Sequence, residues 1–242
     1  MTNFNDITHS THIEILKTII SEPKSLTDIA NTLDISRPEV SRRLNRLRKM
    51  TLVEKEDQLN AISSLGGLIL EILSPLDFIL LHYEFFMEHP FINFPSEFLY
   101  RINQLQPSQL IIGSGNIFQK FIEVARTSHN RLKIILNTPM PNIAGVMWGE
   151  GYFIVPASAK SPILKHEHLS KEIKSYEFRK IPEINYEISI LDEKYGFIYF
   201  PDKSGLPDIN ACFFVDSTEG VDFLISLWNY YWEKSIKFLQ HP

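Results

Sequence analysis

The sequence predicts an α+β protein with a small helical domain at its N-terminus, followed by a larger domain built on a mixed sheet. Apolar residues follow a helical spacing up to about residue 50, and a strongly basic stretch lies at 37–49. From about Phe91 onward, short apolar runs typical of strands alternate with amphipathic stretches typical of helices. The expected parts are an N-terminal domain at 1–64, a helical connector at 65–90 and an α/β domain at 91–242.

Composition indicates the compartment. The chain has 242 residues and a single cysteine, Cys212, so an intramolecular disulfide is impossible and a reducing compartment is expected. The first ten residues are polar and lack the order of a secretory signal. Glu71, Pro75 and Asp77 interrupt the longest apolar runs, which fall short of the roughly 20 residues of a membrane span. We therefore expect a cytoplasmic protein with no membrane partner.

Two short helices are expected first. The first helix is expected at 9–21, and Pro23, which follows it, is the stop signal. Its expected apolar face consists of Ile13, Leu16, Ile19 and Ile20. The second helix runs from about Leu26 to Leu33 and ends near Asp34.

A third helix is expected from about 37 to 50. Ser36 is a suitable N-cap residue, Pro38 fits the first turn, and Glu39 completes a capping box three residues after the cap. Its buried stripe should consist of Val40, Leu44 and Leu47.

The third helix also concentrates positive charge in an otherwise acidic chain. Residues 37–49 hold six Lys or Arg and one acid, whereas residues 65–242 hold fifteen bases and twenty acids. Arginine forks match phosphate and guanine, and short polar side chains can contact base edges. The candidate DNA-binding residues are Ser36, Arg37, Pro38, Ser41, Arg42, Asn45, Arg46 and Lys49. The alternative is a solvated basic helix.

A short hairpin follows the basic helix. One strand is expected at 52–55, the turn at Glu56-Asp57 and the return strand at 59–62. Two helices joined by a tight turn and followed by a hairpin make a winged helix-turn-helix, which presents one helix to the DNA major groove. The tip of this wing is acidic, so we expect it to pack rather than to hold phosphate.

The connector carries apolar residues on more than one helical face, and Pro75 is expected to break or kink it. So much apolar surface between two domains suggests a homodimer interface. A two-fold dimer would place two recognition helices about one DNA turn apart. Packing of the connector on its own C-terminal domain is the alternative.

The C-terminal domain should contain both strands and helices. Helices are expected at 95–105, 116–128, 166–177 and 217–239, and strands at 109–115, 132–136, 151–158, 186–194, 195–201 and 211–217. The order strand, turn, helix, strand from 109 to 136 predicts a βαβ unit with a parallel strand pair.

A small-ligand site in this domain has several candidates. The turn Gly113-Ser114-Gly115 could hold an anion at a helix N-terminus, but it has neither a Walker nor a dinucleotide pattern, and a tight turn is the alternative. Aromatic side chains near the C-terminus could line an apolar pocket, with an ordinary core as the alternative. The remaining candidates are Trp148, Asp202, Trp228, Tyr231 and Trp232.

No arrangement of residues favours catalysis or a metal site. His166 and His168 are two residues apart, whereas a metal pair on one helix face needs a spacing of four. His129 has no acid or nucleophile placed beside it by the sequence. The C-terminal half loosely resembles one lobe of a phospholipase D fold, but it lacks the His-x-Lys-x-x-x-x-Asp signature. We expect no enzymatic activity and no cofactor.

The basic helix and hairpin carry a family resemblance. The stretch 35–56, ISRPEVSRRLNRLRKMTLVEKE, resembles the recognition helix and wing of ArsR/MarR-type regulators. Metal-sensing members of that group use cysteine ligands, and Cys212 alone cannot replace them.

A second resemblance covers nearly the whole chain. The stretches 84–105, 198–208 and 213–235 resemble an archaeal family of winged-helix regulators of methanogenesis and cell filamentation, and 140–180 fit it least. The resemblance implies a homodimeric transcription regulator with a sensory C-terminal domain. It does not supply the ligand.

The leading hypothesis is thus a homodimeric regulator that binds double-stranded DNA and senses a small-molecule effector. One alternative is a small-molecule-binding or enzymatic α/β protein whose N-terminal helices only dimerise it. Another is an adaptor whose winged helix binds a protein.

Overall fold

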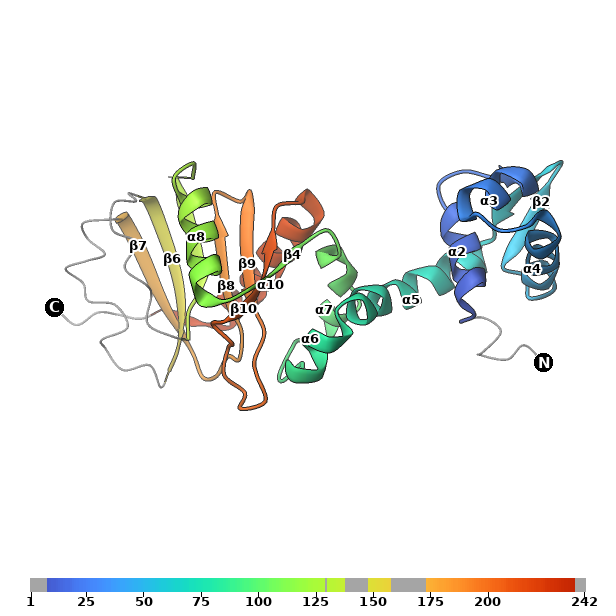
Figure 1. Cartoon of the computed structure of the whole chain (residues 1–242). Coiled ribbons are helices and arrows are strands. Elements are labelled where there is room, and N and C mark those ends of the chain that lie inside the picture. The colour runs from blue at the N-terminus through green and yellow to red at the C-terminus, as the bar shows by residue number, and fades with distance from the viewer. Residues whose placement is uncertain (1–7, 129, 138–147, 158–172, 238–242) are drawn as a thin grey trace. The chain divides into compact units, whose positions relative to one another are not determined.

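The computed structural model describes residues 8–128, 130–137, 148–157 and 173–237 (Figure 1). The chain forms two compact units, Met1–Leu76 and Asp77–Pro242. The predicted class is confirmed, because a helix-turn-helix unit precedes a unit with a mixed β-sheet.

The N-terminal unit contains three helices, α2 (Ser10–Thr18), α3 (Leu26–Leu33) and α4 (Arg37–Lys49). Ile15, Leu16 and Ile19 are buried in its core, whereas Ile20 is exposed, so the predicted apolar face of α2 was wrong at that position. The reason is that α2 ends at Thr18, so Ile20 lies beyond the helix and helical spacing no longer turns its side chain toward the core. Asp34 ends α3 in a left-handed conformation.

A small antiparallel sheet completes this unit. Its strands are β1 (Lys24–Ser25), β2 (Val53–Glu56) and β3 (Leu59–Ile62), in the order β1-β3-β2. The β2–β3 hairpin agrees with the predicted wing, with its turn at Asp57 and Gln58, one residue later than expected. The two-residue strand β1 was not predicted, because it is too short to show a period.

Helix α5 (Ser64–Leu81) runs through Pro75 without interruption, so the predicted break is wrong. A proline inside a helix removes a single backbone hydrogen bond. Buried side chains on either side hold the helix: Leu70 lies in the core of the N-terminal unit and Phe78 in the core of the C-terminal unit. Within the described ranges, α5 is long and apolar enough to cross a membrane by length and composition, a test that core helices of soluble proteins also pass.

The C-terminal unit is built on an eight-stranded sheet in the order β11-β7-β6-β5-β8-β9-β10-β4. The strands are β4 (Gln109–Ile112), β5 (Arg131–Ile135), β6 (Trp148–Pro156), β7 (Ile173–Ile181), β8 (Glu187–Leu191), β9 (Tyr195–Tyr199), β10 (Ala211–Val215) and β11 (Ile236–Lys237). Strands β5, β6 and β7 are parallel, and the remaining pairs are antiparallel. The sheet is therefore mixed, as predicted.

Two predictions for this sheet need correction. Strands β4 and β5 do not form the expected parallel pair, because β8, β9 and β10 lie between them and β4 pairs with β10 at the sheet edge. The expected polar helix at 166–177 is wrong over its last five residues, which begin strand β7 alongside β6. Pairing with a distant strand overrides the local pattern in both cases.

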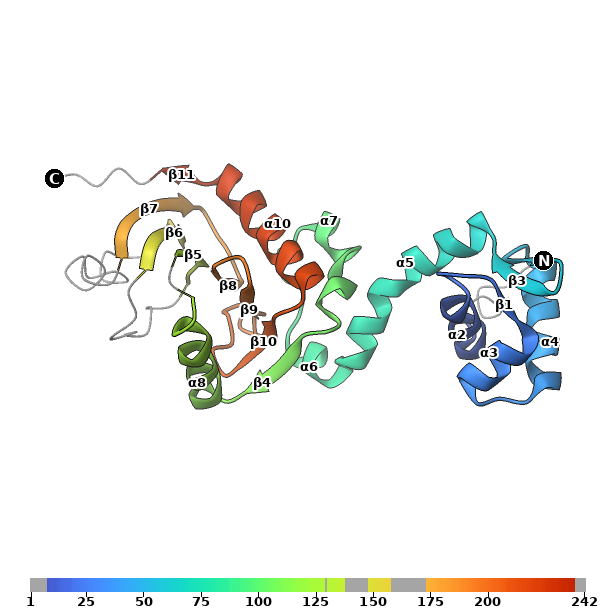
Figure 2. The ribbon, with the colours of Figure 1, turned by 90° about the horizontal axis from the view of Figure 1, so that it is seen from above.

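Helices cover both faces of the sheet, with α8 (Ser114–Ala125) on one side and α10 (Thr218–Lys234) on the other (Figure 2). Three short helices, α6 (Tyr83–Glu88), α7 (Ser96–Leu99) and the 3₁₀ helix η1 (Ile102–Leu105), contribute side chains to the core on the α10 side. The last two replace the single helix expected at 95–105. Two hydrophobic cores result, one on each face.

Candidate nucleic-acid interface

Helix α4 begins as its sequence indicates. The Ser36 side chain accepts a hydrogen bond from the backbone N–H of Glu39 at 3.4 Å, and Pro38 lies in the first turn. Arg46, Arg48 and Lys49 lie in the last turn, where positive charge interacts favourably with the helix dipole. The Ser36 cap thus defines the start of the basic helix, and the basic residues of the last turn stabilise its end.

One face of α4 is fully buried and determines how the helix is oriented. Val40, Leu44 and Leu47 are completely inaccessible and pack in the core with Ile15 and Ile29. Among the eight candidate DNA-binding residues, Ser41 is half-buried and seven are exposed: Ser36, Arg37, Pro38, Arg42, Asn45, Arg46 and Lys49. The candidate residues thus lie together on the solvent side of one helix.

The single acid of α4 is paired within the helix. The Glu39 carboxylate accepts hydrogen bonds from Arg42 at 2.6–3.1 Å and from Arg43 Nε at 2.7 Å. The Arg43 side chain, followed by that of Arg42, holds the pKa of Glu39 below its ordinary value. Arg42 is 70% exposed and Arg43 only 16%, so Arg42 is the more available of the two arginines.

Arg48 has a structural position that the sequence did not reveal. It donates to Asn45 Oδ1 at 2.9 Å and also to the Oδ1 of Asn60, a buried residue of β3. The Asn60 amide in turn donates to the carbonyl of Lys24 in β1 at 3.0 Å. Arg48 therefore ties the basic helix to the small sheet. The only signal in the sequence was a polar Asn60 inside an otherwise apolar strand.

The wing hairpin carries little positive charge. Glu54, Glu56 and Asp57 are exposed along it, and Lys55 is the one base between them. This distribution places the basic surface of the unit on α4 rather than on the wing.

Residues 9–55 match the family described as "Bacterial regulatory protein, arsR family". The N-terminal unit carries an ArsR-type helix-turn-helix DNA-binding domain. The match spans about a fifth of the chain and does not extend to the sheet of the C-terminal unit. A comparison with curated protein sequences gives no match.

Solved structures resemble the chain only weakly. TrmBL2, an archaeal chromatin protein, has 13% identity and a TM-score of 0.40, covering 95% of this chain and 94% of its own. NucT from Helicobacter pylori, at 13% identity and a TM-score of 0.40, covers 54% of this chain and 98% of its own. Nuc from Salmonella typhimurium, a phospholipase D family member, has 8% identity and a TM-score of 0.39, with coverages of 55% and 99%. Likenesses of this strength do not decide function, and the methanogenesis and filamentation family stays an expectation.

The candidate ligand residues of the C-terminal unit do not come together in one place. Gly113 has a φ of 95° and precedes α8, while Ser114 and Gly115 form the exposed first turn of that helix. Asp202 accepts hydrogen bonds from the backbone and the hydroxyl of Ser204, which lower its pKa. These residues shape local turns.

The aromatic candidates belong mainly to the cores. Trp148 is fully buried in the core on the α8 side. Trp228 and Tyr231 are buried in the core on the α10 side, and Trp232 packs partly buried against it. The cluster therefore forms core structure on two opposite sheet faces rather than one pocket.

Within the described ranges, no group of three or more histidine, cysteine and acidic side chains could hold a metal ion. The histidines considered for metal binding or catalysis, His129, His166 and His168, lie outside those ranges.

Proposed function

We propose that this protein is a homodimeric transcription regulator of the cytoplasm, which binds operator DNA through α4 and senses a small molecule through its C-terminal unit. The ArsR-type domain supports DNA binding. The observation that carries the proposal is the exposed face of α4, where Arg37, Arg42, Arg46 and Lys49 lie opposite the buried stripe.

These side chains have distinct proposed roles. The four cations contact phosphates or guanine, because arginine forks match both groups. Ser41 and Asn45 are short enough to contact base edges. Ser36 and Pro38 form the start of the helix, which we propose to lie beside the DNA phosphate backbone. Phosphate contacts of this kind give most of the affinity and make it dependent on salt.

The homodimer rests on helix α5. One face of this helix bears large apolar side chains that are 45–66% exposed. They lie three or four residues apart and consist of Leu65, Leu68, Ile72, Leu76 and Leu80. We propose that a second copy of the chain covers this stripe, because in a two-fold dimer the same apolar surface of each copy packs against that of the other. Because these side chains are already about half buried, burying the rest of each contributes roughly half of the 1.5–3 kcal/mol that a fully exposed side chain would give.

Fluorescence anisotropy tests DNA binding. The probes are a duplex from upstream of the protein's own gene and a scrambled duplex of equal length, each titrated at several salt concentrations. We expect preference for the native sequence and a log–log salt slope of roughly −0.9 per phosphate contact. Arg42→Ala/Arg46→Ala should lose this binding.

The matched control is Arg126→Ala/Lys203→Ala, which removes the same charge from exposed positions of the C-terminal unit. If the control weakens binding as much as the α4 variant, net charge rather than α4 determines affinity, and the proposal fails. A salt slope near zero would contradict it as well.

A further inference from the structure

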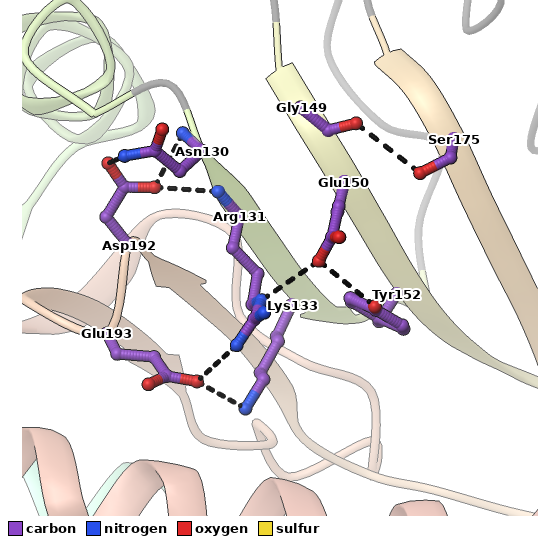
Figure 3. Close-up of polar contacts among 9 residues, drawn as sticks. All are labelled: Asn130, Arg131, Lys133, Gly149, Glu150, Tyr152, Ser175, Asp192 and Glu193. Carbon is purple, nitrogen blue, oxygen red and sulfur yellow. Dashed lines mark hydrogen bonds and ion pairs between the residues drawn. The ribbon is translucent and has the colours of Figure 1, made fainter.

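A cavity of about 410 Å³ opens at the amino-terminal ends of β5 and β6, beside the β8–β9 turn. Figure 3 shows Arg131 of β5, Glu150 of β6 and Glu193 of the turn pointing toward one another. The volume lies within the range of small-molecule sites. A second cavity of about 270 Å³ shares Glu193 and Lys194 with it.

The backbone around this cavity is held in place. Asp192 and Glu193 form the turn with φ values of 52° and 56°, a region that side chains other than glycine rarely adopt. The Asp192 carboxylate accepts hydrogen bonds from the backbone N–H groups of Asn130 and Arg131 at 2.8 and 2.7 Å. A Cβ atom at Gly149 would lie 2.7 Å from the Asn130 carbonyl oxygen, so this wall admits only glycine.

The charged side chains leave groups free for a ligand. Arg131 is shared between Glu150, at 3.2 Å, and Glu193, at 3.4 Å, and Lys133 also donates to Glu193 at 2.8 Å. Tyr152 donates its hydroxyl to the Glu150 oxygen that Arg131 contacts, at 3.1 Å. Among the hydrogen bonds between described residues, the second carboxylate oxygen of Glu150 and of Glu193 accepts none.

These ion pairs can exchange partners at little cost. The side chains of Arg131, Glu150 and Glu193 are 45%, 44% and 41% exposed. Pairs so open to solvent contribute little to folding stability. A guanidinium held at two long contacts can instead form a short bidentate pair with a ligand carboxylate.

We propose that this cavity binds a free α-amino acid as a zwitterion, its carboxylate on Arg131 and its ammonium group between Glu150 and Glu193. The charges carry this choice. An anion would lie against the carboxylates of Glu150, Asp192 and Glu193, and a cation would lie against Arg131 and Lys194. Only a ligand with both charges satisfies both sets of side chains. The inference deepens the sensing role proposed above by naming the class of effector.

Isothermal titration calorimetry on the full chain tests this proposal, with the twenty free L-amino acids as probes. We expect at least one to bind. Its N-acetyl derivative and its amide, which each lack one charge, should bind at least about tenfold more weakly. Arg131→Met and Glu150→Gln should each weaken binding by about ten- to a hundredfold. Arg131→Lys, which keeps the charge without the fork, should fall between wild type and Arg131→Met.

The matched control is Lys203→Met, which breaks an exposed ion pair with Glu88 elsewhere in the same unit. It should leave amino-acid binding unchanged. Circular dichroism checks that every variant is folded. The proposal is overturned if no amino acid binds, if the derivatives bind as well as their parents, or if Arg131→Met and Glu150→Gln bind as wild type does.

DNA anisotropy on the same proteins separates this inference from the proposed function. Amino-acid binding without DNA binding would contradict the regulator and leave the ligand site standing. DNA binding without amino-acid binding would contradict the ligand site alone.

Discussion

The Glu39 carboxylate and the Arg42 guanidinium form a two-pronged ion pair one turn apart on α4, with Arg42 Nε and Nη2 at 3.1 and 2.6 Å from Oε2. Of the two arginines that pair with Glu39, Arg42 is nevertheless much the more exposed to solvent. In the free protein, the only acid of the helix therefore holds a side chain proposed to contact DNA. Binding to phosphate has to compete with this pair.

Replacing Glu39 with Gln should strengthen DNA binding. The change removes a negative charge beside the phosphates and frees Arg42. Loss of one repulsive charge next to the phosphates should therefore raise the affinity several-fold. Anisotropy with native and scrambled duplexes measures it, and the gain should appear on both. Weaker binding of the native duplex alone would mean that Glu39 itself contacts a base.

Loss of the Arg48–Asn60 contact should destabilise the ArsR-type domain. Arg48→Met leaves the buried Asn60 amide without its charged donor. Hydrogen bonds to charged groups contribute about 1.5–3 kcal/mol, which sets the expected loss in the free energy of unfolding. Urea denaturation followed by circular dichroism measures this quantity. Arg37→Met is the control, because Arg37 is exposed, and it should change stability by less than about 0.5 kcal/mol.

A charge in the apolar stripe of α5 should separate the proposed dimer. Ile72→Glu places a carboxylate in the proposed interface, and analytical ultracentrifugation should show a shift from dimer to monomer. Ile20→Glu is a matched control, since both isoleucines are 57% exposed and Ile20 lies outside α5. A wild-type monomer, or a dimer unchanged by Ile72→Glu, would contradict the interface. Partition of the wild type into lipid vesicles would instead indicate that α5 meets a membrane.

Glu193 should titrate below its ordinary pKa. Its hydrogen bond from Lys133 is the largest cause that lowers the pKa from 4.5, and Arg131 adds to it. The stabilisation from the ionised form is therefore present above pH 4.5 and is lost as the pH falls through the lower folded value. Carbon-detected NMR titration of the carboxyl group measures the midpoint. Lys133→Met should move the midpoint upward, and an unchanged midpoint would contradict the assigned cause.

Local sequence determined the parts of this protein that depend on neighbours in the chain. Helix α4, its cap at Ser36 and its buried stripe could be predicted because capping and helical spacing act within a few residues. The exposed basic face follows from the same spacing. The strand runs of the C-terminal unit were likewise visible, because alternation and apolar runs are local patterns.

Tertiary structure alone decided which distant segments meet. Three strands come between β4 and β5, and residues 173–177 join β6 instead of forming a helix. Arg48 reaches Asn60 across the domain. Arg131, Glu150 and Glu193 converge from three separate segments. Such contacts depend on the free energy of packing the whole chain, which no local pattern contains.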